Sequence, residues 1–452
     1  MVEKLKNEAG SSLVYVLIIS LILSATLLIL FTFILIQTRH INAKENFLKA
    51  KYAAESGLYS YINQMQNTGI RNVPGEYFNN LIKVTDRDSA KIISYPWGGY
   101  RYVYSQSHHK GQQFQLSAYL GMEHSAIFHN AIIMNPEYSS LVVTGDTRIH
   151  GDVQTGLKGV KKGTIAGRPY TGDQLVYGRI IKNREDQRPH LNKAYIDDVY
   201  RYFHDRLQNA SPVNFENLVS DKSDSVSLGG MENCFLLNNE ILNNRNWKIK
   251  GPGVLISDEA LTINTALTIN EQVQILCNHK IKIEGPAQIQ DAIFFSPENI
   301  NVSTAYRFEG QLFSERSILI GQAVHLDYPS IAMVYTSRDT GSITIANGVE
   351  INGTVLYLSN RDTIVSSPSS GKIDIQLGAT VNGIVCSDNY TTLSGQVNGA
   401  IITDRFYYYY SPTVYFNWIK DGIIDRNKLN DEYKLPLFFK ISNPQLTPLF
   451  LR

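Results

Sequence analysis

The stretch from Gly253 to Phe406 repeats with a spacing of about 20 residues, and this repeat constrains the fold more than any other feature. Four consecutive units, which begin at "GVLIS", "VQILC", "AIFFS" and "QLFSE", are 19 or 20 residues long, and two later units are lengthened by loops. Each unit holds short β-rich segments separated by polar corners, which leaves no room for crossover helices. Such units predict a mainly β fold, a right-handed parallel β-helix (solenoid) whose coils stack about 4.8 Å apart.

The same pattern starts earlier in the chain, so the solenoid is expected to cover residues 126–406. Residues at about 189–208 interrupt it with an amphipathic helix. The apolar positions that share one face of this helix are Ile196, Val199, Tyr200, Phe203 and Leu207. The inserted helix is expected to pack against the side of the solenoid or to cap one end, where it would protect unpaired strand edges.

Residues 407–452 are expected to form an aromatic-rich C-terminal cap. The run from Tyr407 to Tyr410 is unusual, because an aromatic cluster can stack on sugars or nucleobases or anchor a partner interface. Covering the exposed end of a solenoid is the commoner use of such a run, and it is the interpretation adopted for these tyrosines.

An uncharged segment lies between Glu8 and Arg39 and is long enough to cross the roughly 30 Å core of a bilayer. A cleaved secretory signal has an apolar region of only about 7–15 residues, followed by a cleavage site. Here the polar continuation keeps a helical spacing of apolar residues, and no proline or glycine occurs between Ser11 and Ser56. Residues 11–66 are therefore predicted to form one long helix, whose first half lies in lipid and whose second half protrudes from the membrane.

Three features of this N-terminus belong together: a short charged leader, residues 1–10, that ends in Gly10, the apolar segment after it, and an "AAESGL" motif further along the helix. The motif residues that matter are Ala53, Ala54, Glu55, Gly57 and Leu58. With these features the chain resembles the type IV pilins, and within that superfamily it is most similar to the PilX-type minor pilins. The resemblance implies that prepilin peptidase cleaves the Gly10–Ser11 bond and that the new N-terminus is methylated.

Tyr15 departs from the pilin pattern. Pilins that form the bulk of a filament usually carry a glutamate at the fifth mature position, which is Tyr15 in this chain. A carboxylate in lipid is costly unless it meets the amino group of a neighbouring subunit, so its presence marks polymerisation. Its replacement indicates a tip, initiating or accessory subunit, or an anchored relative that does not polymerise.

Residues 67–125 are expected to form a linker that contains a β-hairpin. Glycine and proline end the helix, and aromatic or apolar residues then alternate along two strands, at Tyr100–Tyr104 and at Phe114–Leu120. His108 and His109 fall in the expected turn. They are interpreted as solvated turn residues rather than metal ligands, because no third ligand stands nearby in the sequence.

One compact polar cluster, Arg148, His150 and Asp152, lies in the repeat region. On a shared strand face, His150 and Asp152 could support proton transfer or metal binding, whereas the alternative is that Asp152 and the adjacent glycines form a corner. Carbohydrate-active β-helix enzymes need clustered acids, and here the acids are scattered over the corners. The sequence therefore predicts no catalytic residue, no metal site and no cofactor.

Charge and cysteine content argue against other classes. Lys and Arg total 42 and Asp and Glu total 41, so no global field draws the chain to nucleic acid. Cys234, Cys277 and Cys386 lie far apart, each in an apolar run, which predicts buried free thiols instead of disulfides or zinc ligands.

Together these features predict a non-catalytic minor pilin or pseudopilin-like subunit of a type IV pilus or related secretion filament, with the β-helix as a display or adhesion surface. The expected location is the bacterial cytoplasmic (inner) membrane, crossed once, with the body facing the periplasm or exterior and incorporated in a surface pilus. The expected partners are the membrane, other pilin-like subunits, the pilus assembly machinery, prepilin peptidase and surface polysaccharide.

Two other functions stay open. One is a membrane-anchored carbohydrate-active β-helix enzyme, and the other is a membrane-tethered scaffold resembling the bactofilins, with its body in the cytoplasm. The flanking charges favour the cytoplasmic orientation when taken alone, because Arg39, Lys44 and Lys49 follow the apolar segment closely.

Overall fold

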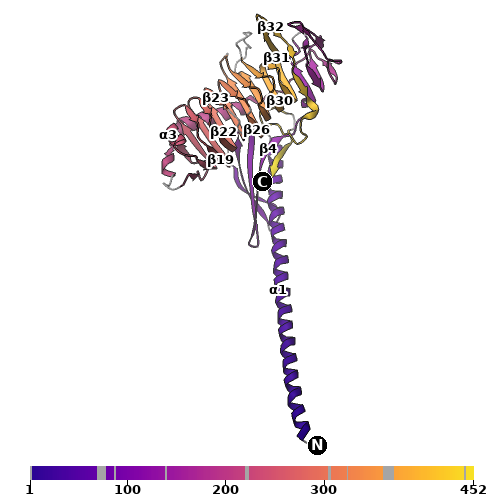
Figure 1. The fold of residues 1–452 in the computed structure, drawn as a ribbon, viewed down its shortest axis with the longest axis vertical. Coiled ribbons are helices and arrows are strands. Elements are labelled where there is room, and N and C mark those ends of the chain that lie inside the picture. Colours follow the sequence, from indigo (N-terminus) through magenta and orange to yellow (C-terminus); the bar gives the residue numbers. More distant parts are fainter. Residues whose placement is uncertain are drawn as a thin grey trace.

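The N-terminal part of the protein is a single helix, α1 (Glu3–Thr68), whose first half stands away from the rest of the chain (Figure 1). At 1.5 Å per residue, its 66 residues extend about 100 Å. Residues 12–45 are all exposed, and α1 is the one helix among the described residues that is long and apolar enough to cross a membrane. The prediction of a long apolar N-terminal helix is thereby confirmed.

The structure is a computed structural model. It describes residues 3–68, 78–85, 88–137, 140–218, 223–303, 307–322, 324–338, 340–359, 371–441 and 444–451.

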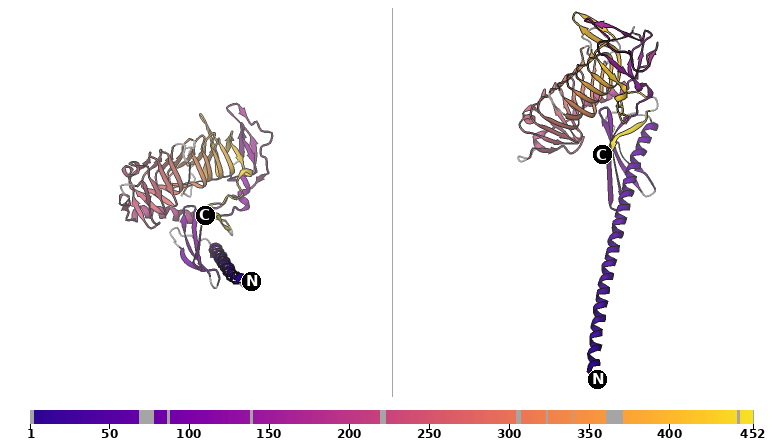
Figure 2. Two further views of the ribbon diagram at one scale, coloured as in Figure 1. Left: turned by 60° about the horizontal axis from the view of Figure 1, so that its bottom comes forward. Right: turned by 45° about the vertical axis from the view of Figure 1, so that its right-hand side comes forward.

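An antiparallel sheet of five strands lies between α1 and the remaining β structure (Figure 2). Its strands, in spatial order, are β1 (Phe78–Lys83), β2 (Ser89–Trp97), β3 (Tyr100–His109), β4 (Gln112–Met122) and β35 (Leu446–Leu451). The predicted hairpin is the β3–β4 pair, in which Tyr102 pairs with Tyr119. The linker interpretation of residues 67–125 is corrected, because β1, β2 and the C-terminal β35 extend this hairpin into a sheet. Residues 69–77 lie outside the described residues.

Most other strands pair in parallel with a strand about one repeat unit away. Gly253 pairs with Val273, Val273 with Ala292 and Ala292 with Gly310, so strands that are neighbours in space lie 18 to 20 residues apart in the chain. The chain is mainly β, as predicted, and its parallel pairings follow the unit length found in the sequence. The result is an elongated stack of short strands (Figure 1).

The stack is held together by rows of buried aliphatic side chains in register. One row consists of Ile263, Ile283, Val302, Ile320, Ile345, Ile375 and Leu393. Each of these side chains is at most 2% exposed. A single unit of this kind cannot bury its own apolar face, so the stability of the stack comes from contacts between neighbouring units.

The strands from residue 213 to residue 410 follow one another along the stack. They are β13 (Val213–Asn214), β14 (Ser225–Ser227), β15 (Cys234–Leu236), β16 (Lys248–Lys250), β17 (Gly253–Ser257), β18 (Leu261–Ile263), β19 (Leu267–Asn270), β20 (Val273–Cys277), β21 (Ile281–Ile283), β22 (Ala287–Ser296), β23 (Asn299–Val302), β24 (Arg307–Ser314), β25 (Ser317–Ile320), β26 (His325–Thr336), β27 (Ser342–Ile345), β28 (Glu350–Ser359), β29 (Lys372–Ile375), β30 (Thr380–Leu393) and β31 (Gln396–Tyr410). A short helix, α3 (Asn239–Asn243), packs beside β18.

The remaining strands of the stack do not follow the order of the chain. β31 pairs with β5 (Asn130–Met134), β5 with β8 (Asp152–Thr155) and β8 with β12 (Ile180–Lys182), always in parallel. Residues 130–182 therefore extend the stack beyond its last repeat unit instead of preceding the first. The expectation of one run in chain order over 126–406 is corrected accordingly.

The inserted helix, α2 (Lys193–Asn209), lies along the side of the stack near the predicted range of 189–208. All five predicted apolar positions on it are buried. The Tyr200 hydroxyl donates to the carbonyl oxygens of Ser314 and Met333, each at 3.3 Å, and the Phe203 ring stacks on Phe295 at 4.9 Å. Because these partners belong to three successive units, α2 packs against the side of the stack and does not cap an end.

A histidine joins α2 to the stack and makes this contact dependent on pH. His204 Nε2 lies 2.6 Å from Glu315 Oε1, and this hydrogen bond raises the pKa of His204. Its stabilisation is complete below the unfolded pKa of about 6.5 and is lost as the pH rises through the raised folded value. His204→Gln should therefore lower the melting temperature at pH 5.5 and change it little at pH 9. The loss of stability at pH 5.5 should be under about 1 kcal/mol, because both groups are partly solvated.

Thermal unfolding of the detergent-solubilised full chain measures this difference, and His108→Gln serves as the control because His108 is exposed. Equal destabilisation of the His204 variant at both pH values would contradict the assigned ion pair.

The aromatic run does not cap the stack, which corrects the interpretation of residues 407–452. The end of β31 and β32 (Thr413–Phe416) form an antiparallel hairpin, in which Tyr409 and Tyr410 are 55% and 47% exposed. The stack continues past β31 through β5, so its end is covered by an earlier part of the chain. The segments that follow β32 join the same end as β33 (Trp418–Lys420), which pairs with β6 (Leu141–Thr144), and β34 (Ile423–Asp425), which pairs with β7 (Arg148–His150).

Candidate functional site

The "AAESGL" motif is the place where α1 meets the antiparallel sheet. Ala54 and Leu58 are fully buried, Ala53 is 5% exposed, and Gly57 is buried beside Ala90 of β2. A Cβ atom at Gly57 would overlap the Cβ atom of Ala90, so the helix and the strand approach more closely than any larger residue allows. The small residues of the motif therefore set the distance between α1 and the sheet.

Hydrogen bonds from the sheet hold α1 in this position. The Ser105 hydroxyl donates to the carbonyl oxygen of Ala54 at 2.7 Å, and the Ser107 hydroxyl donates to that of Ala50. The buried Arg101 side chain donates through Nε to the Tyr61 hydroxyl at 3.0 Å. These residues were not predicted from the sequence. Alternating serines on a strand of otherwise large residues are nevertheless a pattern that indicates a closely packed helix.

The other motif positions have different surroundings. Glu55 is half-buried and forms an i,i+4 pair with Lys51 at 3.8 Å, so it contributes little to docking. Tyr15 is 65% exposed on the free part of α1. The Gly10–Ser11 bond lies within the helix. One helix thus combines an exposed apolar half with a half that is fixed to a folded body.

Arg148, His150 and Asp152 do not form a common site. Gly151 has a φ of 120°, which separates β7 from β8 and places His150 and Asp152 on different strands, so the shared strand face is wrong and the corner interpretation holds. Each side chain has its own partner. His150 stacks on Tyr177 with ring centroids 4.6 Å apart, and Arg148 lies near the Thr171 hydroxyl.

Asp152 is occupied by Arg179. Its carboxylate accepts from Arg179 Nη2 at 2.6 Å, Nε at 2.9 Å and the backbone amide at 2.8 Å. These hydrogen bonds hold the pKa of the Asp152 carboxyl below its usual range, as expected for a structural ion pair.

The histidine pair and the cysteines also have definite places. His108 and His109 end β3, while Lys110 and Gly111 form the turn, and His109 Nδ1 lies 2.6 Å from Asp88 Oδ1. The solvated-turn interpretation is therefore corrected for His109. The three cysteines are free and buried, as predicted, and burial raises the pKa of Cys386 to about 12. Among the described residues, no group of three His, Cys, Asp or Glu side chains is placed to hold a metal ion.

Comparisons with known proteins add little to these observations. No family model and no curated protein matches the sequence. Among solved structures, the chain is similar to the competence-associated pilin ComZ from Thermus thermophilus, with 11% identity and a TM-score of 0.24, over 90% of this chain and 97% of that chain. A similarity this weak carries no argument about function.

Proposed function

We propose that the protein is a membrane-anchored, non-catalytic minor pilin or pseudopilin-like subunit of a type IV pilus or related secretion filament. In this proposal the parallel stack is a right-handed β-helix that serves as a display or adhesion surface. The antiparallel sheet joins this surface to α1, and Tyr15 in place of glutamate assigns the chain a tip, initiating or accessory position.

The observation that carries the proposal is the division of α1 into two halves. Residues 13–36 expose mainly apolar side chains, and burying each large one contributes about 1.5–3 kcal/mol. This half therefore needs lipid or neighbouring helices around it, whereas the half from Ala50 onward is fixed to the sheet. An anchor that continues directly into a docked helix is suited to carry a folded body at a fixed distance from a membrane or a filament axis.

Processing of the N-terminus tests the pilin part of the proposal. We expect mass spectrometry of the native protein to find a methylated N-terminus at Ser11, and Gly10→Val to block this cleavage because the leader glycine is replaced. The matched control is Ser12→Ala, which leaves the cleaved bond intact. An unprocessed Met1 in the wild-type protein would contradict the pilin assignment while leaving a simple membrane anchor in place.

Orientation tests the location. We expect protease added to intact cells, after permeabilisation of any outer envelope layer, to digest the body while a cytoplasmic marker stays whole. A protected body would favour the alternative of a cytoplasmic, bactofilin-like scaffold.

One observation favours a second candidate, a membrane-anchored carbohydrate-active enzyme. Three acids, Glu232, Glu271 and Asp291, line a single groove beside the stack. Glycoside hydrolysis requires a pair of carboxyl groups on either side of the scissile bond. Cleavage of an oligosaccharide by the purified protein would support this candidate over the non-catalytic one.

A further inference from the structure

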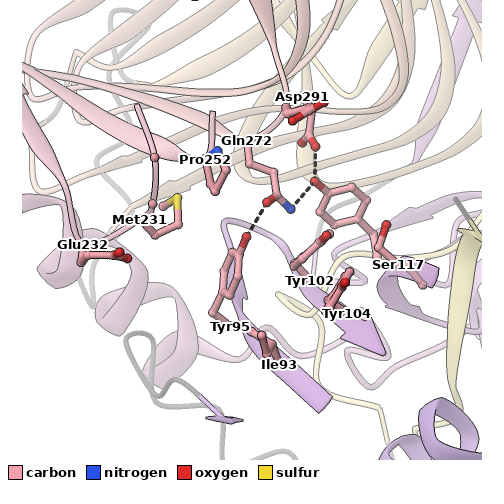
Figure 3. A pocket seen from close by; sticks show the side chains of 15 residues that line it. Ile93, Tyr95, Tyr102, Tyr104, Ser117, Met231, Glu232, Pro252, Gln272 and Asp291 are labelled. Carbon is pink, nitrogen blue, oxygen red and sulfur yellow. Dashed lines mark hydrogen bonds between the residues drawn. The ribbon is translucent and has the colours of Figure 1, made fainter. Parts of the chain in front are cut away.

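A groove of about 540 Å³ separates the antiparallel sheet from the corners of the parallel stack (Figure 3). Its volume falls within the range of about 300–1,000 Å³ that is common for small-molecule sites. The sheet contributes one wall from β2, β3 and β4, and the other wall comes from corners around Glu232, Pro252, Glu271 and Asp291. The groove lies on the face of the sheet opposite α1, because the residues that contact α1 and those that line the groove alternate along β3.

The wall on the sheet is a row of tyrosines. Tyr95, Tyr102 and Tyr119 are direct cross-strand neighbours, with ring centroids 5.0 and 5.5 Å apart. Tyr104 lies in the next row, and its hydroxyl donates to Gln115 at 2.8 Å. Burial raises the pKa of Tyr102 and Tyr119, so both phenols are neutral at physiological pH. Tyr119 is 3% exposed, so the ring surface comes from the partly exposed Tyr95, Tyr102 and Tyr104. This surface has a low entropic cost, since a tyrosine has only two side-chain torsions to fix.

The opposite wall holds polar groups in fixed positions. Gln272 Nε2 donates to the Tyr119 hydroxyl at 3.1 Å, its Oε1 accepts from Tyr95, and Asp291 accepts from Tyr119 (Figure 3). Glu271, Gln272 and Asp291 all have positive φ, at 61°, 51° and 61°. They are three of the seven non-glycine residues with this backbone among the described part of the chain. Such conformations cost about 1–3 kcal/mol each and concentrate at ligand sites.

The charge of the groove restricts its ligand. Glu232, Glu271 and Asp291 are acidic, and none of the described side chains that line the groove is cationic; the nearest paired cation is Lys250, whose Nζ lies 3.3 Å from Glu271 Oε1. This excess of negative charge disfavours an acidic ligand, whereas hydroxyl groups can donate to the exposed carboxylates of Glu232 and Glu271. Gln272 and Asp291 are each 6% exposed and hold Tyr95 and Tyr119 in place. The apolar C–H face of a sugar ring can pack on a tyrosine ring, so one ligand satisfies both walls.

We propose that this groove binds a neutral oligosaccharide, with Tyr95, Tyr102 and Tyr104 under the sugar rings and the carboxylates of Glu232 and Glu271 holding the hydroxyl groups. The use of the site in surface attachment rests on the proposed display function. Binding itself does not depend on membrane insertion, on processing at Gly10 or on entry into a filament, so the two proposals can fail separately.

The test uses the full-length protein in a zwitterionic detergent without a sugar head group, because a maltoside would compete for the groove. Saturation-transfer NMR and calorimetric titration with chitotriose, cellotriose and maltotriose should show binding of at least one of them. Tyr104→Ala and Glu271→Gln should each weaken that binding at least tenfold. Tyr409→Ala is the matched control, since Tyr409 is exposed on the distant β31–β32 hairpin and should leave binding unchanged.

Other outcomes would overturn the proposal. Absence of binding for all three trimers would mean that the groove is only the space between two packed units. Equal loss of binding in Tyr409→Ala would assign the effect to general aromatic adhesion. Stronger binding of trigalacturonate or of choline than of any neutral trimer would exclude a neutral sugar as the ligand. Cleavage of a trimer by the wild-type protein would show that the groove is a catalytic site and not a binding site alone.

Discussion

Replacing Gly57 by leucine should release the second half of α1 from the antiparallel sheet. Any Cβ atom at this position overlaps the Cβ atom of Ala90, which belongs to the strand itself and cannot rotate away. Leucine also meets Ile92, whose Cδ1 atom would lie 3.5 Å from the new Cβ. The gain in helix propensity from removing a glycine is about 1 kcal/mol, whereas overpacking typically costs about 1–3 kcal/mol, and a leucine against a fixed Cβ atom belongs at the upper end of that range.

Limited proteolysis of the detergent-solubilised chain measures this release. We expect faster cleavage after Lys49 or Lys51, together with a lower melting temperature of the sheet. Tyr59→Leu is the control on the same helix, because Tyr59 is 53% exposed and faces away from the sheet. A Gly57→Leu protein with wild-type protection would show that α1 does not need the close approach at Ala90.

The length of α1 could be predicted, but its docking could not. The uncharged segment after Glu8 and the absence of helix breakers are local properties of the sequence. The contact of Gly57 with Ala90, in contrast, depends on a sheet whose strands come from residues 78–122 and from the C-terminus. No local pattern indicates that β35 pairs with β4, because this pairing joins positions more than 300 residues apart.

In the parallel stack, too, local features could be predicted from the sequence and long-range contacts could not. The unit length was predictable, because aliphatic residues recur at a spacing that the strand registers then follow. The spatial order was not, since residues 130–182 resemble further units and any end of the stack can accept them. Pairings between distant positions determine which end they occupy, such as that of Ile401 with Ile132 and that of Ile424 with Ile149, and these contacts span more than half of the chain.

The candidate sites were harder to predict than the fold. Arg148, His150 and Asp152 are close in sequence, yet the backbone at Gly151 sends their side chains to separate partners. The residues of the tyrosine groove are, in contrast, far apart in the sequence and close together in the structure. Its two walls come from residues 93–119 and 229–291, and they meet only because the sheet docks on the stack. The alternating tyrosines of β3 predicted a strand correctly but gave no indication of the acidic wall opposite.

The second large effect is expected at Gly383, in the centre of the stack. Gly353, Gly383 and Gly399 are paired in register on β28, β30 and β31. A Cβ atom at Gly383 would overlap the carbonyl oxygen of Gly353, and one at Gly399 would overlap that of Gly383. Because the obstacle is the backbone of Gly353, Gly383→Ala must separate β30 from β28, to which it is paired, and we expect a loss of about 4 kcal/mol.

The asparagines beside these glycines make the same separation costly. Asn382 Nδ2 donates to Asn352 Oδ1 at 2.7 Å, and Asn398 Nδ2 donates to Asn382 Oδ1 at 2.7 Å. Moving β30 away from β28 to admit a methyl group lengthens the Asn382–Asn352 hydrogen bond, which contributes about 1 kcal/mol, unless β31 and its Asn398 bond move with β30. The glycine and asparagine rows therefore act as one unit, and their energies should not add independently.

Guanidinium unfolding followed by tryptophan fluorescence measures the Gly383→Ala effect, since Trp97 and Trp247 are both buried. Leu377→Ala is the matched control in the same repeat unit, because Leu377 is 69% exposed and its truncation should change stability by no more than about 0.5 kcal/mol. If Gly383→Ala and Leu377→Ala unfold at the same denaturant concentration, the strands do not approach as closely as the glycine row requires. A shift confined to Gly383→Ala would instead establish that backbone contact between successive units, and not only aliphatic burial, determines the stability of the stack.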